Sequence, residues 1–130
     1  ILPLKFIVYF KHMITVTGSL AFDHIMDFPG NFSEHIMPDK IHQINLSFLF
    51  NTLSKQRGGT AGNIAYNLAL LKNPVRIVGV VGEDFADYAN FLSQAGVDVS
   101  SIQKIDNSLT SSAFIMTDLS DNQITAFCHL

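Results

Sequence analysis

Arg57-Gly58-Gly59-Thr60-Ala61-Gly62-Asn63 is the stretch of this 130-residue chain that decides its fold. Up to this point the apolar residues are spaced as in strands, whereas from Ala61 onward they recur at helical spacing, at 61, 64, 65, 68 and 71. The change predicts an amphipathic helix over residues 61–72 with Thr60 as its N-cap. Asn73 is expected in the left-handed position after the helix, and Pro74 prevents its continuation.

The same stretch is a candidate ligand site. Its two leading glycines let the backbone take unusual dihedral angles and approach a ligand closely, and the helix N-terminus behind them carries free amide donors. Asn63 offers a donor and an acceptor to hydroxyl groups. The alternative is that the glycines only make a tight turn onto a packed helix, and the residues alone leave both interpretations open.

Two phosphate-binding motifs are excluded. A Walker A loop ends in Gly-Lys-Ser/Thr, and this chain has Gly62-Asn63-Ile64 instead. Neither residues 58–62 nor residues 79–82 supply the G-x-G-x-x-G fingerprint of dinucleotide-binding domains. A dinucleotide-binding oxidoreductase is therefore disfavoured.

Asp23 is the second candidate site residue. It follows the first predicted strand, at the edge of an open α/β sheet where ligands bind, and it lies five residues beyond Gly18. When ionised, its carboxylate can accept hydrogen bonds from two neighbouring sugar hydroxyls. Considered by itself, the residue is better explained as a solvated loop aspartate.

The rest of the chain alternates strands and helices. Residues 75–81 form a nearly continuous apolar run, typical of a strand covered on both faces. A second helix is predicted over residues 84–95, capped by Asp84 and ended by Gly96. The other predicted strands span residues 14–17, 20–28, 44–50, 97–105, 112–118 and 123–127, with a loop at 31–42. This order favours an α/β fold with a parallel sheet and right-handed crossovers.

Composition excludes several classes of protein. The chain is 48% hydrophobic and 15% charged with a net charge of −3, which argues against disorder and against binding to nucleic acid or to an anionic membrane surface. One cysteine, Cys128, excludes an internal disulfide framework and suggests the cytoplasm. The five histidines show no metal-ligand spacing, so no metal site is predicted, and Cys128 receives no catalytic role.

Both ends of the chain are unusual. Residues 1–12 precede the first methionine and are expected to lie outside the fold, with an edge strand at residues 6–10 as the alternative. They are too short and too broken for a membrane span, and no signal-peptide cleavage pattern follows them. The hairpin predicted at residues 112–127 runs almost to Leu130, which suggests a chain cut short.

Several motifs together resemble the amino-terminal part of a PfkB-family (ribokinase-like) carbohydrate and nucleoside kinase. They are Gly-Ser-Leu-Ala-Phe-Asp at 18–23, Gly-Gly-Thr-Ala-Gly-Asn-Ile-Ala-Tyr-Asn-Leu-Ala-Leu-Leu at 58–71, residues 78–85 and residues 95–98. Within the family, residues 30–50 and 118–127 look most like bacterial adenosine-kinase-like members.

The resemblance implies a three-layer α/β/α core formed in part by residues 13–130, with a small β lid at about residues 20–57. It implies transfer of the γ-phosphoryl group of ATP, with Mg²⁺, to a hydroxymethyl oxygen of a sugar or nucleoside. Asp23 would hold the sugar hydroxyls, and Gly58, Gly59 and Asn63 would line the same pocket. A homodimer through the lid is also implied.

The chain departs from the family pattern at Ala21, Ser19 and Thr60, where relatives carry two sugar-binding asparagines and a lysine. These differences favour a nucleoside or a sugar other than ribose. No Gly-Ala-Gly-Asp follows, so the catalytic base and the main ATP and Mg²⁺ sites are expected in a carboxyl-terminal part beyond this chain. The chain alone is expected to be inactive. The alternative is a truncated, non-catalytic module that binds a ligand or dimerises.

Overall fold

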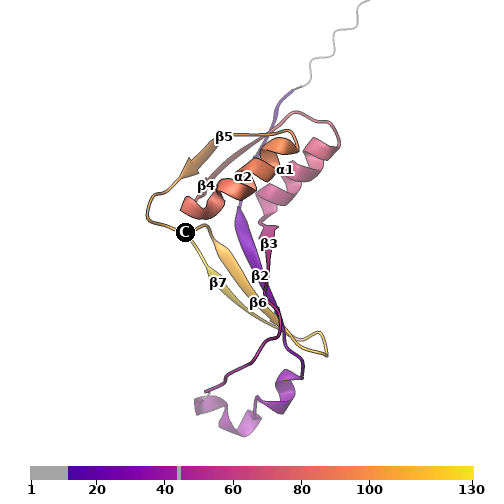
Figure 1. Ribbon diagram of the computed structural model, residues 1–130, viewed down its shortest axis with the longest axis vertical. Helices are drawn as coiled ribbons and strands as arrows, with labels where there is room; N and C mark the ends of the chain where they lie inside the picture. Colours follow the sequence, from indigo (N-terminus) through magenta and orange to yellow (C-terminus); the bar gives the residue numbers. More distant parts are fainter. Residues whose placement is uncertain (1–11, 44) are drawn as a thin grey trace, which may run out of the picture.

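The computed structural model describes residues 12–43 and 45–130, which form two sheets and two α-helices (Figure 1). The first sheet is parallel with strand order β1-β4-β5. Its strands are β1 (Ile14–Thr17), β4 (Val75–Val81) and β5 (Val97–Lys104), and its helices are α1 (Thr60–Leu70) and α2 (Ala86–Gln94). The predicted parallel α/β arrangement is therefore confirmed. The expectations for residues 1–11 lie outside the described residues.

The second sheet is mixed and has the order β3-β2-β6-β7. Its strands are β2 (Ala21–Asp27), β3 (Ser54–Gly58), β6 (Ser112–Thr117) and β7 (Gln123–Cys128). Strand β2 pairs in parallel with β6 and antiparallel with β3. The predicted lid segment at about residues 20–57 supplies two of these strands, and the carboxyl-terminal hairpin supplies the other two.

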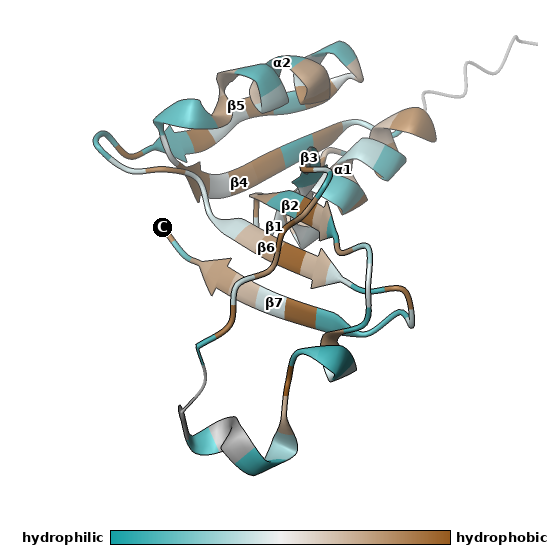
Figure 2. Ribbon diagram, turned by 60° about the horizontal axis from the view of Figure 1, so that its bottom comes forward, coloured by the Kyte–Doolittle hydropathy of each residue, from teal (hydrophilic) through white to brown (hydrophobic). Residues whose placement is uncertain are grey.

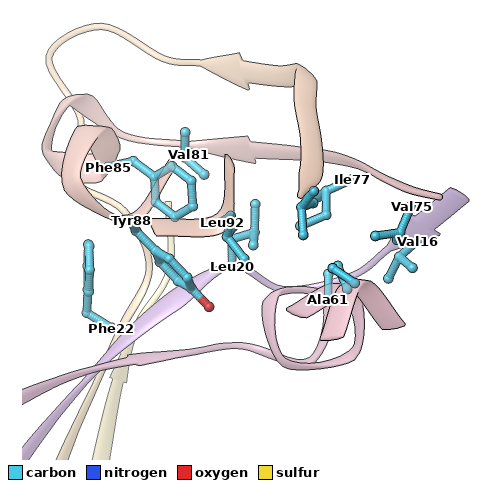
Figure 3. Close-up of a cluster of buried hydrophobic side chains, with 13 residues drawn as sticks. Val16, Leu20, Phe22, Ala61, Val75, Ile77, Val81, Phe85, Tyr88 and Leu92 are labelled. Carbon is cyan, nitrogen blue, oxygen red and sulfur yellow. The ribbon is translucent and has the colours of Figure 1, made fainter. Parts of the chain in front are cut away.

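The apolar core lies between the first sheet and both helices (Figure 3). Ile77 of β4, Ala61 of α1 and Leu92 of α2 are fully buried in it. Both crossovers run in the same direction across the sheet, so both helices cover the same face. Strand β4 is largely apolar (Figure 2), yet Val78 and Val80 on its other face are 43% and 47% exposed. The predicted strand is therefore apolar on both faces, but among the described residues only one of these faces is covered.

Helix α1 has ends that differ from those predicted. Gly59, with φ +87°, is its N-cap, and Thr60 is already helical and caps nothing with its side chain. The left-handed residue after the helix is Lys72, with φ +61°, rather than Asn73. The Asn73 N–H donates to the Leu68 carbonyl at 3.1 Å, as in a Schellman ending that closes one residue earlier than the apolar pattern indicates.

The start of helix α2 also differs from the prediction. A 3₁₀ turn at Glu83–Phe85 precedes α2, and Phe85 occupies the N-cap position. The Asp84 carboxylate does not cap α2, because it accepts a hydrogen bond from the Thr110 N–H at 2.8 Å. The predicted end is confirmed, since Gly96 takes the left-handed conformation with φ +96°.

The prediction of a strand over residues 44–50 is wrong for the described residues 45–50, which have no regular structure. Two aromatic side chains of this stretch pack against another aromatic ring, and its backbone does not pair in a sheet. Phe48 and Phe50 pack against Phe28, with ring centroids 5.1 and 6.0 Å apart. The strand that pairs with β2 is β3, whose sequence Ser-Lys-Gln-Arg-Gly carries no apolar signal. Two 3₁₀ segments, Phe32–Glu34 and Pro38–Gln43, occupy the predicted connecting loop.

None of the helices that the structure describes combines the length and the apolar character that a membrane crossing requires.

Candidate functional site

A pocket of about 370 Å³ lies where the second sheet meets the N-terminus of α1. Three residues singled out from the sequence, Asp23, Gly59 and Asn63, line it together. Gly58 lies directly behind Asp23 and does not line the pocket. The other lining residues are Ser19, Ala21, Thr60, Ser111, Ser112, Ala113, Phe127, Cys128 and His129. Residues from four separate stretches of the chain therefore converge on one pocket.

Asp23 reaches the pocket from the middle of strand β2, so it is not a loop aspartate. It is half-buried, and strand pairing places Gln56, Asp23, Ala113 and Phe127 in one cross-strand row. Directly paired residues point to the same face of a sheet. The small Ala113 side chain stands between the carboxylate and the Phe127 ring, and Asp23 brings a negative charge to the pocket.

Both glycines of the turn are required by packing. A Cβ atom at Gly58 would stand 2.4 Å from the Asp23 Oδ2 atom. A Cβ atom at Gly59 would stand 2.4 Å from the Ser19 carbonyl oxygen, and its φ of +87° is unfavourable for other residues. The tight-turn interpretation of these glycines is thus correct. The same turn brings Gly59 to the wall of the pocket and Gly58 against the Asp23 carboxylate.

The first turn of α1 offers fewer free amides than the sequence suggests. The Thr60 N–H donates to the Ser19 Oγ atom at 2.9 Å, and the Ala61 N–H donates to the Ser19 carbonyl at 3.0 Å. The Asn63 N–H donates to the Gly59 carbonyl at 3.1 Å. Ser19, 41 residues before Thr60, therefore caps the helix from another segment. The Asn63 side chain remains as a polar group of this turn on the pocket wall.

Strands β6 and β7 supply pocket residues that the sequence did not mark as part of the site, among them Cys128. Phe127 is 69% exposed, and its ring stacks on that of His129 with centroids 6.3 Å apart. The alternation of residues 112–117 and 123–128 indicates which side chains share a face. Only the pairing of β2 with β6, about 90 residues apart in the chain, shows that this face is the one that carries Asp23.

The positive charges of β3 lie on its other side. The Lys55 Nζ atom is 3.6 Å from the centre of the Phe22 ring and 4.0 Å from the Asp84 carboxylate. The Arg57 guanidinium lies over the Phe91 ring at 4.5 Å. Neither cation lines the pocket, whose polar side chains include Asp23, Asn63, His129 and several hydroxyls. Across the part of the chain that the structure describes, no cluster of three or more His, Cys, Asp or Glu residues could hold a metal ion.

The parallel α/β sheet with a second, mixed sheet beside it is a ribokinase-like arrangement, and the pocket lies beside the N-terminus of α1. Residues 13–128 match the pfkB family of carbohydrate kinases, and the chain belongs to that family. The ribokinase of Cryptococcus neoformans, 21% identical, has the same fold with a TM-score of 0.73 over 89% of this chain and 34% of its own.

Curated and solved relatives include nucleoside kinases. That of Methanothermobacter thermautotrophicus is 30% identical over 116 residues, which are 88% of this chain and 34% of the relative. The structure of the Burkholderia thailandensis nucleoside kinase is 39% identical with a TM-score of 0.74, and the match covers 91% of this chain and 36% of that protein. The chain therefore spans about a third of the length of the relatives it matches.

Proposed function

We propose that this chain binds the acceptor in a reaction that transfers the γ-phosphoryl group of ATP to a hydroxymethyl oxygen of a sugar or nucleoside. The observation that carries the proposal is the meeting of Asp23, Gly59 and Asn63 in one pocket. A carboxylate accepts hydrogen bonds from two adjacent ring hydroxyls, and the Asn63 amide donates and accepts. Charge-assisted hydrogen bonds of this kind are the stronger ones in proteins. Gly59 gives the sugar close access to the backbone, and Gly58 leaves room for the Asp23 carboxylate.

The acceptor that fits this pocket best is a nucleoside, with adenosine and inosine as the first candidates. Phe127 supports this choice, because its exposed ring stands in the same cross-strand row as Asp23. A base attached to a sugar held by Asp23 would find an aromatic face there, whereas free ribose would leave that face in water. The relative from Burkholderia thailandensis was solved in complex with inosine, which supports the same class of acceptor.

ATP and Mg²⁺ serve such a reaction by supplying the phosphoryl group and by neutralising its charge. Among the described residues, no group of three or more His, Cys, Asp or Glu side chains could hold a metal ion, and the Thr60 and Ala61 amides of α1 already have partners. The Gly-Ala-Gly-Asp motif of the family does not occur in the chain, which supports the proposal that the catalytic base and the main ATP and Mg²⁺ sites lie outside these 130 residues. Residues 13–130 would form the amino-terminal part of the kinase domain, which would act in the cytoplasm.

The second sheet is proposed to mediate a homodimer. On the face of this sheet away from the pocket, Phe114 of β6 is 40% exposed. Size-exclusion chromatography of the protein made from its complete coding sequence tests this directly. A dimer that Phe114→Ser converts to a monomer supports the proposal, and a wild-type monomer contradicts it.

The test of the proposed function is a phosphoryl-transfer assay with adenosine, inosine, ribose and fructose as acceptors. The protein made from the complete coding sequence is expected to phosphorylate a nucleoside with the highest kcat/KM. The 130-residue chain by itself is expected to show no turnover, because a general base contributes about 10²–10⁴-fold and electrostatic stabilisation contributes further. Preference for a free sugar would overturn the choice of acceptor. Turnover by the 130-residue chain would show that the catalytic groups lie within it.

A further inference from the structure

Tyr88 of α2 is a buried side chain whose polar atom reaches the glycine turn of the pocket. Tyr88 is 2% exposed, and its hydroxyl donates a hydrogen bond of 3.0 Å to the Gly58 carbonyl. In Figure 3 the hydroxyl points toward the segment that leads from β3 into α1. Tyr88 does not line the pocket.

The carbonyl that Tyr88 holds belongs to the peptide unit between Gly58 and Gly59. Gly58 and Gly59 are adjacent glycines, so the peptide unit between them rotates with little steric resistance unless something fixes it. The Asp23 carboxylate lies so close to Gly58 that no side chain fits between them. Rotation of this peptide unit would therefore move the backbone against which the carboxylate rests.

Tyr88 contacts the other two pocket-forming segments as well. Its ring lies 5.9 Å from that of Phe22, the residue before Asp23. A Cβ atom at Gly62, the residue before Asn63, would stand 2.1 Å from the Tyr88 hydroxyl oxygen. One side chain thus touches a sequence neighbour of each of the three pocket residues. Burial raises the pKa of the Tyr88 hydroxyl and outweighs the lowering effect of the Arg57 charge, with a smaller rise from Asp23, so the group stays protonated as a donor at neutral pH.

We propose that Tyr88 is a positioning residue for acceptor recognition. Its hydroxyl holds the Gly58-Gly59 peptide and the first turn of α1 in the arrangement that brings Asp23 and Asn63 to a common sugar. The acceptor does not contact Tyr88, which acts from the opposite side of β3. This inference rests on the proposed function, since it needs Asp23 and Asn63 to bind the acceptor.

Tyr88→Phe tests the proposal, because it removes the hydroxyl and keeps the ring. In the protein made from its complete coding sequence, we expect the acceptor KM to rise roughly tenfold, equivalent to about 1.4 kcal/mol, while the KM for ATP stays unchanged. Tyr66→Phe is the matched control, since Tyr66 also stacks on α2, with its ring 4.9 Å from Phe91. This control variant is expected to keep the wild-type acceptor KM.

A second measurement does not depend on catalysis. The rise in melting temperature on binding depends on the ratio of the free acceptor concentration to its Kd, so Tyr88→Phe should need about tenfold more nucleoside than wild type for the same shift. Gly62→Ala provides a second variant, because its methyl group would meet the Tyr88 hydroxyl. It should weaken acceptor binding in the wild-type background and weaken it less in Tyr88→Phe, where that oxygen is gone.

The outcomes separate the two proposals. If Asp23→Ala raises the acceptor KM and Tyr88→Phe leaves it unchanged at a temperature where both variants are folded, Tyr88 has only a structural role and this inference is wrong. Should Asp23→Ala leave the acceptor KM unchanged, the proposed acceptor site is wrong and the inference falls with it. A lower melting temperature of Tyr88→Phe with normal acceptor titration also contradicts the positioning role.

Discussion

The two sheets of this chain are held together in different ways. Around the first sheet, fully buried aliphatic side chains such as Ile77 and Leu92 pack between strands and helices. Beyond the second sheet, few of the described residues between 28 and 53 are buried, and aromatic rings cluster around Phe28. The first region therefore depends on apolar burial, and the second depends more on specific polar contacts.

Asp118 is the centre of those polar contacts. It is 6% exposed, and its carboxylate accepts hydrogen bonds from the N–H groups of Phe32, Ser120 and Asn122, each at 2.9 Å. Burial opposes its charge, but the hydrogen bonds from Asn122, Phe32 and Ser120 outweigh this and lower its pKa to about 2. One carboxylate thus joins the turn between β6 and β7 to the 3₁₀ turn that begins at Phe32.

Removing a core side chain should produce the largest effect on stability. Leu92→Ala deletes a fully buried side chain and is expected to reduce the free energy of unfolding by about 2–5 kcal/mol, measured by urea denaturation. Leu49→Ala makes the same chemical change in the second region, where Leu49 is 82% exposed, and should stay within about 0.5 kcal/mol of wild type. Equal losses from the two variants would contradict the comparison.

Acid should loosen the second region through Asp118. Its pKa is lowered in the folded state, so its stabilising contribution is fully present above the ordinary aspartate pKa and is lost as the pH falls towards about 2. The amide of Phe32 is expected to exchange with solvent faster as the pH falls through this range, relative to its intrinsic exchange rate, while the amide of Ile77 stays protected. Asp118→Asn should give the fast exchange of Phe32 already at neutral pH. Unchanged protection of Phe32 in that variant would show that Asp118 does not hold the turn.

The smallest effects concern the start of α1, where the regions meet. Ser19→Ala removes the hydroxyl oxygen that accepts the Thr60 N–H and should cost about 1 kcal/mol of unfolding free energy, as loss of a helix cap does. Thr60→Ala should change it by less than about 0.5 kcal/mol, because the Thr60 side chain caps nothing. A larger loss of unfolding free energy in Thr60→Ala than in Ser19→Ala, measured by urea denaturation, would show that Thr60 is the cap after all.

Elements set by local sequence could be predicted. Strands β1, β4 and β5, helix α1 and the glycine end of α2 follow from apolar spacing and from residues such as Pro74 and Gly96. The glycine turn could be placed for the same reason, since only glycine tolerates the backbone of residue 59.

Elements set by distant partners could not be predicted. The polar strand β3 exists because β2 pairs with it, and residues 45–50 leave the sheet because Phe48 finds Phe28. Likewise, Asp84 prefers the Thr110 N–H to the start of α2. The site was predicted in its two local parts, Asp23 and the glycine turn with Asn63. Its third wall, with Phe127, depends on strand pairing that the sequence does not reveal.

The proposed function depends most on the Asp23 carboxylate as the group that binds the acceptor. Steady-state kinetics of Asp23→Ala with adenosine or inosine, in the protein made from its complete coding sequence, test this role directly. Two charge-assisted hydrogen bonds at roughly 1.5–3 kcal/mol each would be lost, so kcat/KM for the nucleoside should fall by about a hundredfold or more. Asp106→Ala, at an exposed carboxylate 3.6 Å from Lys104 and outside the pocket, should keep wild-type kinetics. If Asp23→Ala also keeps the wild-type kcat/KM for the nucleoside, the carboxylate does not bind the acceptor and the proposed site is wrong.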